Sequence, residues 1–253
     1  MTTLAADEAR DYELGDINEL PVIAADIIYE GAAVGDNASG YARPLASGDP
    51  FRGFAERKVD NSSGSAGDKN VRLVKKGLIS LAVSGLAITD VGRPVYATDD
   101  DTFVLTGIGS YIGLVHRYVS SGVGIIAFDA DKLEEVQIVS IPITLAKLAN
   151  GDVVTTYTPG FHGRIKALDF VVHDPVTTGA KAATLNAEIG TTNLTGGTVA
   201  LTSANCTPLG AIVAGAAITG AAAFKDTDTI SIEASSVTTF IEGTGVLLVK
   251  LGK

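Results

Sequence analysis

The chain has 253 residues, 46% of them hydrophobic and 19% charged, and this composition excludes an intrinsically disordered protein. Its formal net charge of −10 argues against nucleic acid as a direct partner, because an acidic surface repels phosphate groups. Residues 1–140 carry 12 basic and 21 acidic side chains, a net of −9, whereas residues 141–253 carry 7 and 8, a net of −1. This asymmetry predicts two domains with different surroundings.

The first 20 residues are polar and acidic and show no hydrophobic periodicity. They are predicted to form an acidic N-terminal arm that becomes ordered on a partner. They lack the apolar core of a signal peptide, and the most apolar uncharged stretch, residues 209–224, is shorter than the roughly 20 residues that a membrane span needs. No membrane partner is therefore expected.

Residues 21–140 are predicted to form a first β domain, a small barrel or sandwich, because short strand-like runs follow one another at close spacing. The runs are GYARPLA (40–46), FRGFAERKV (51–59), VRLVKKGLISLAV (71–83), RPVYAT (93–98), TFVLT (102–106), YIGLVHRYV (111–119) and VGIIAFD (123–129). The segment DKLEEV (131–136) is compatible with a short helical turn. The domain boundary is placed near Ser140.

Residues 141–253 are predicted to form an antiparallel, jelly-roll-like β-sandwich, which makes the whole chain all-β. Apolar and polar side chains alternate in residues 184–189 and 229–234, the period of a strand with one buried face. The run from Val246 to Leu251 is nearly all apolar, which predicts a central strand that is covered on both faces.

No pattern in the chain indicates a catalytic, cofactor-binding or metal-ligating residue. The glycine-rich segment GIGSYIG (107–113) lies between two strand-like runs and opens no helix, so it is interpreted as a turn and a strand rather than a dinucleotide loop. Asp99–Asp101 are interpreted as a solvated hairpin tip rather than a calcium site. We therefore expect no cofactor, no metal and no enzymatic activity.

The remaining reactive side chains give the same prediction. His116, His162 and His173 do not show the spacing of a zinc site, and no nucleophile-elbow motif is present. A catalytic triad set by geometry alone stays open at this point. Cys206, the single cysteine, lies in a neutral stretch and is interpreted as a partly buried small residue.

Two segments of the first domain carry a family resemblance: YEGAAVGDNASGYARPLASGDPFRGFAERKVDN (29–61) and VGRPVYATDDDTFVLTG (91–107). With VRLVKKGLISLAV and YIGLVHRYVSSGVGIIAFD (111–129), they make residues 21–129 resemble the small β domains of tailed-bacteriophage capsid decoration, or cement, proteins. The blocks at residues 157–172 and 181–197 resemble β domains appended to phage head and head-fibre proteins. Together the resemblance covers about four-fifths of the chain.

The resemblance implies a structural protein on the exterior of the virion, made in the host bacterial cytoplasm, with the major capsid protein of the phage head as its partner. It also implies a homotrimer. It carries over no active-site residue. The alternatives are a head-fibre, tail or baseplate module that binds a host surface, and a hydrolase whose site the sequence does not show. Because residues 21–140 hold the resemblance and residues 1–140 nearly all the net charge, this part is expected to bind the capsid, with residues 141–253 facing outward.

Overall fold

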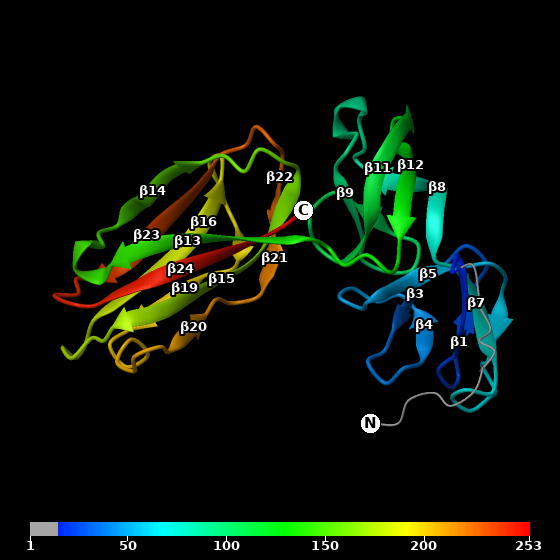
Figure 1. Ribbon diagram of the computed structural model, residues 1–253, viewed down its shortest axis with the longest axis horizontal. Helices are drawn as coiled ribbons and strands as arrows, with labels where there is room; N and C mark the ends of the chain where they lie inside the picture. The colour runs from blue at the N-terminus through cyan, green and yellow to red at the C-terminus, as the bar shows by residue number, and fades with distance from the viewer. Residues whose placement is uncertain (1–14) are drawn as a thin grey trace, which may run out of the picture.

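The computed structural model describes residues 15–253, and every regular element longer than three residues in that part is a β-strand (Figure 1). The predicted all-β class is therefore confirmed. Among these residues, no helix combines the length and the apolar character needed to cross a membrane. Residues 1–14 of the predicted acidic arm (1–20) lie outside the described part. Its last residues, from Ile17 on, form a strand, so the prediction of an unpatterned arm as far as residue 20 is wrong there.

The chain begins with a five-stranded antiparallel sheet in the order β1-β7-β5-β3-β4. A single bridge between Val22 and Ala42 connects the end of β1 to β4, which brings the two edges of this sheet together. The small pair β2–β6 lies beside it. The strands are β1 (Ile17–Pro21), β2 (Ile27–Ile28), β3 (Ala33–Asp36), β4 (Ala42–Pro44), β5 (Phe51–Ala55), β6 (Val59–Asp60) and β7 (Asn70–Val74).

A closed five-stranded barrel follows, in the order β10-β8-β12-β11-β9. Its elements are β8 (Lys76–Ser84), the short 3-10 helix η1 (Ile88–Asp90), β9 (Pro94–Ala97), β10 (Phe103–Val104), β11 (Ser110–Ser120) and β12 (Val123–Asp129). The run at residues 71–83, predicted as one strand, is two strands that meet at Lys75. The Lys75 amide donates to the carbonyl of Asp16 beside β1, and its carbonyl accepts from the amide of Ala130 after β12. The chain thus leaves the sheet at Lys75 and enters the barrel.

One hydrophobic core lies between the sheet and the barrel. The rings of Phe51 and Phe54 on β5 pack edge-on against Phe128 on β12, and the Phe54–Phe128 centroids are 4.9 Å apart. Phe54 also contacts Phe103 on β10. Because edge-to-face aromatic pairs stabilise a packing beyond the area they bury, the two small sheets form one packed unit. The part predicted as a single small barrel or sandwich thus contains two sheets around a shared core.

The rest of the chain folds into two packed sheets with jelly-roll connectivity, as the sequence predicts. One sheet has the order β13-β24-β15-β20 and the other β14-β23-β16, with β17 and β19 both paired to β16. The elements are β13 (Val136–Thr144), η2 (Leu145–Lys147), β14 (Gly151–Tyr157), β15 (Gly163–Asp174), β16 (Ala182–Ile189), β17 (Thr192–Asn193), β18 (Thr195–Gly196), β19 (Val199–Thr202), β20 (Ile212–Ala214), β21 (Ile218–Gly220), β22 (Ala223–Phe224), β23 (Ile230–Thr238) and β24 (Thr244–Gly252).

Strand β24 is central in its sheet, yet only one of its faces is covered. Leu247, Val249 and Leu251 point between the two sheets and are fully or almost fully buried. Val246, Leu248 and Lys250 lie on the outer face and are partly exposed. The prediction that this strand is covered on both faces is wrong, because the sandwich has two layers and the second layer reaches only the inner face.

Gly113 on β11 marks a place where two barrel strands approach too closely for a side chain. A Cβ at this position would overlap the carbonyl oxygen of Ala127 on β12, a backbone atom that moves only with its strand. The pairing of β11 with β9 shifts register between Tyr111 and Gly113, so the strand bends at this glycine. The barrel therefore closes around a position that only glycine fits.

We predict that Gly113→Ala lowers the free energy of unfolding by about 2 kcal/mol, because the barrel must open to accept the methyl group. Chemical denaturation measures this change, with circular dichroism as the signal because the chain contains no tryptophan. Gly179→Ala is the matched control: a Cβ there meets no atom within 4 Å, and the backbone does not have a positive φ. Equal stabilities of the two variants would contradict the prediction.

Candidate functional site

The side chains singled out in the sequence lie on separate elements. His116 is exposed on β11, His162 precedes β15, and His173 is exposed near the end of β15. Asp99–Asp101 form the turn between β9 and β10, where Asp99 Oδ1 accepts the amides of Asp101 and Thr102. Cys206 is fully buried, and burial raises the pKa of its thiol, which keeps the sulfur protonated and unreactive.

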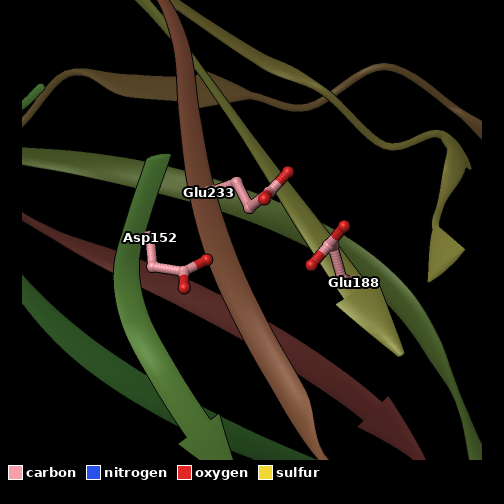
Figure 2. Close-up of side chains that lie close together, drawn as sticks. All are labelled: Asp152, Glu188 and Glu233. Atoms are coloured by element: carbon pink, nitrogen blue, oxygen red, sulfur yellow. The ribbon is translucent and has the colours of Figure 1, made fainter. Parts of the chain in front are cut away.

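The structure brings together three carboxylates that the sequence does not single out. Asp152 on β14, Glu233 on β23 and Glu188 on β16 have carboxylate oxygens within 4.8 Å of one another (Figure 2). Asp152 is paired directly with Glu233, and Glu188 with Ser231, whose hydroxyl donates to Glu188 at 3.3 Å. Such oxygens are the ligands that hard cations prefer, but an acidic cluster on an open sheet face does not by itself make a metal site.

A buried carboxylate with several partners, Glu134, lies in the segment that joins the barrel to the sandwich. Its side chain is only 4% exposed. Arg164 on β15 binds it through two parallel bonds, Nε to Oε1 at 2.9 Å and Nη2 to Oε2 at 2.7 Å. Lys166 contacts Oε2 at 2.7 Å, and the Tyr96 hydroxyl of the barrel donates to Oε1 at 3.1 Å. One carboxylate thus connects three parts of the chain.

Arg164 extends this connection into the barrel. Its Nη1 donates to the backbone carbonyls of Gly107 and Gly109 at 2.8 and 3.2 Å, and its guanidinium lies 4.3 Å from the centre of the Tyr96 ring. A planar guanidinium can bind a carboxylate, two carbonyls and an aromatic face at once, which a lysine cannot do. Lys166 reaches the same carboxylate because it lies two residues after Arg164 on β15, on the same face of the strand.

The protonation of the joint follows from these contacts. Burial disfavours the charged form of Glu134, but the hydrogen bonds from Arg164 and Lys166 outweigh it and hold the pKa of this carboxyl below its ordinary value. Burial, together with the negative charge of Glu134, raises the pKa of Tyr96, so its hydroxyl stays a donor. A second ion pair joins the same two units, with Lys225 Nζ 3.8 Å from Asp90 Oδ1.

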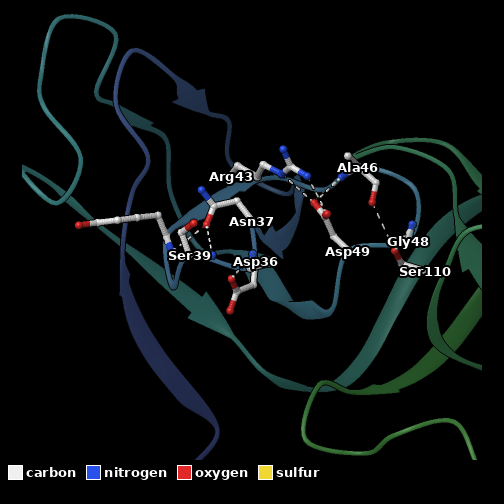
Figure 3. Close-up of polar contacts among 10 residues, drawn as sticks. Asp36, Asn37, Ser39, Arg43, Ala46, Gly48, Asp49 and Ser110 are labelled. Atoms are coloured by element: carbon white, nitrogen blue, oxygen red, sulfur yellow. Dashed lines mark hydrogen bonds and ion pairs between the residues drawn. The ribbon is translucent and has the colours of Figure 1, made fainter.

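A similar polar joint fixes the N-terminal sheet to the barrel (Figure 3). Arg43 binds Asp49 through two bonds, of 2.9 and 2.7 Å, and this partner lowers the pKa of Asp49. Asp49 also accepts the amide of Ala46 at 3.0 Å. The loop shaped in this way donates the Gly48 amide to the Ser110 hydroxyl at the start of β11, at 3.1 Å. Figure 3 shows this chain of contacts running from the sheet to the barrel.

These joints position surfaces relative to one another and hold no group poised for reaction. Arg164 and Glu134 satisfy each other, and the Tyr96 hydroxyl is engaged. The sequence gives little sign of the joint, since its members are 30 to 57 residues apart along the chain. The one local signal, the acidic pair in DKLEEV (131–136), lies in a segment whose sequence is also compatible with a short helical turn. Residues 132–135 are in fact extended linker without regular structure.

Comparison with known proteins gives no close relative. No protein-family model matches the chain, and no curated protein matches it. The VP2 subviral particle of infectious bursal disease virus is 10% identical with a TM-score of 0.26, in a match that covers 98% of this chain and 74% of that chain. A structure of the Gx strain of the same virus is 8% identical with a TM-score of 0.26, in a match that covers 94% of this chain and 69% of that chain. At these TM-scores the likeness carries no inference about this chain.

We predict that Glu134→Gln loosens the joint, because two partly buried cations then lose their counter-charge, at a cost of about 3 kcal/mol. Small-angle scattering should show a larger radius of gyration, and limited proteolysis should cut residues 130–135 faster. Because the folded-state pKa of Glu134 lies below its unfolded value, its contribution is complete above the ordinary glutamate pKa and is lost as the pH falls through the lowered one. The wild type should loosen in that acidic range.

Glu135→Gln is the control for this prediction, since Glu135 is exposed and its backbone carbonyl accepts the amide of Lys253, a bond that the substitution keeps. It should leave the scattering curve and the proteolysis rate unchanged. If both variants behave like the wild type, Glu134 does not hold the joint.

Proposed function

We propose that this protein is a structural component of a virus particle, a capsid decoration protein that binds the outside of a bacteriophage head and stabilises its shell. Its partners are the major capsid protein and copies of itself, in a homotrimer, and it catalyses no reaction. The resemblance of residues 21–129 to cement domains supports this role. Within it, residues 21–140 bind the capsid and the sandwich faces outward.

The observation that carries the proposal is an apolar row on the outer face of the barrel. Leu78 on β8 pairs with Ala127 on β12, which pairs with Leu114 on β11, so these three side chains lie side by side across three strands. Leu78 is 60% and Leu114 39% exposed. An apolar row on an otherwise acidic domain favours a protein partner whose apolar surface is bordered by basic groups.

Binding of many copies to a lattice explains how such a small contact surface would act on a shell. Each contact contributes little, but contacts repeated over linked subunits add up through avidity. A protein that binds the assembled shell and not its dispersed subunits stabilises the shell by mass action. Rigid joints favour this role, because copies that have one shape fit a repeating lattice without a further ordering cost.

We predict that purified virus particles containing this chain hold hundreds of copies, in a number divisible by three. Quantitative mass spectrometry against the major capsid protein measures the ratio. A few copies per particle would contradict decoration of the lattice and support the head-fibre, tail or baseplate alternative.

We also predict that Leu78→Lys and Leu114→Lys each weaken binding to undecorated heads about ten-fold or more, because a charge would be buried in an apolar contact. Co-sedimentation with heads lacking the protein measures this affinity. Leu209→Lys is the matched control, an exposed apolar residue in the loop between β19 and β20 of the sandwich. Loss of binding in the control but not in the barrel variants would assign the capsid contact to the sandwich.

A further inference from the structure

The sandwich has an apolar outer face that nothing in the described chain covers. Across the sheet β13-β24-β15-β20, the pairing places side chains in rows on this face. Two rows cross all four strands, and the first consists of Pro142, Val246, Val171 and Ile212. The next row adds Ser140, Leu248, Asp169 and Ala214. Ile212 is 68% and Ile138, in the third row, 53% exposed.

The opposite face of the same sandwich is chemically different. Its outward positions include Asp152, Glu233 and Glu188 (Figure 2). Asn186 and Thr184 lie on the same side of β16 as Glu188. A polar, negatively charged face is compatible with water, whereas an apolar face of four strands is costly to leave exposed. The difference indicates that one side of the sandwich faces solvent and the other faces a partner.

The charge of the apolar face points to a second copy of this chain as the partner. Its charged pair is Lys250 and Asp169, with Nζ and Oδ2 2.7 Å apart, so the face is neutral in a chain of net charge −10. A copy related by symmetry presents the same Lys and Asp, and each can pair with its opposite across the contact. Residues 141–253 carry 7 basic and 8 acidic groups, so two copies meet there without strong repulsion.

The size and the edge of the face determine how copies would meet. Three strands about 30 Å long and 4.8 Å apart, with a short fourth strand, give a footprint of roughly 500 Å² per copy, or on the order of 1,000 Å² for the pair, the lower limit for a specific interface. Pro142 on the edge strand β13 cannot donate to a new strand, which disfavours pairing edge to edge. The contact is then made face to face.

We infer that two copies of this protein associate face to face through the outer face of β13, β24, β15 and β20, in a two-fold contact that is separate from the one that would build the proposed homotrimer. The inference does not depend on the proposed capsid role, because it concerns this chain alone. The face remains available to a second copy when the barrel is bound to another protein, since the two surfaces belong to different units joined at Glu134.

Sedimentation equilibrium of the full chain and of Ile212→Glu tests this. We expect the wild type to associate and the variant to raise the dissociation constant about ten-fold or more, because it places like charges opposite each other at the contact. Ile241→Glu is the matched control, with 66% exposure and a position in the loop between β23 and β24. It should associate like the wild type. Circular dichroism confirms that all three proteins are folded.

Cross-linking gives an independent measurement. Cys206 is buried and is the chain's single cysteine, so Ile212→Cys introduces one accessible thiol. A short bis-maleimide should link copies of Ile212→Cys and should not link Ile241→Cys. A wild type that stays monomeric at tens of micromolar concentration, or an Ile212→Glu variant that associates as strongly as the wild type, would overturn the inference.

Discussion

The buried pairing of Glu134 with Arg164 is the main polar contact that holds the sandwich against the barrel, and the directions of the outer surfaces depend on that placement. A buried carboxylate is costly unless every oxygen has a donor, and here Arg164, Lys166 and Tyr96 supply the donors from two structural units. The pair therefore contributes specificity of orientation more than net stability.

Most of the fold follows from local patterns in the sequence. The alternation at residues 184–189 and 229–234 predicts one-sided strands, and the structure places residues 184–189 in β16 and 230–234 in β23, paired with each other. Jelly-roll connectivity is consistent with strands of this number and spacing. The break at Lys75 was missed because a run of apolar and basic residues contains no turn residue before Gly77, and only pairing with β1 and β12 ends the strand there.

The polar sites were not predictable, since their members meet only through tertiary structure. Arg164 lies 30 residues from Glu134 and 57 from Gly107, and no spacing rule connects them. The carboxylates of Asp152, Glu188 and Glu233 come from three strands whose register is fixed by the fold. The wrong prediction about β24 is informative in another way. The sequence of β24 is largely apolar on both faces, which is typical of a strand covered by a layer on each side. The described chain covers only its inner face, with the second sheet of the sandwich.

That mismatch connects the two proposed surfaces. If Val246 and Leu248 are covered by a second copy, the joint at Glu134 fixes the angle between this contact and the apolar row at Leu78, Ala127 and Leu114 on the barrel. Copies joined through their sandwiches would then present their barrels in a fixed relative geometry, which raises the effective concentration of the second barrel once the first is bound. A flexible joint would spread the barrels over many orientations and reduce that gain. In this proposal, the buried charge at Glu134 and the partly exposed apolar face of β24 would serve one physical requirement, a unit of fixed shape that makes several weak contacts at once.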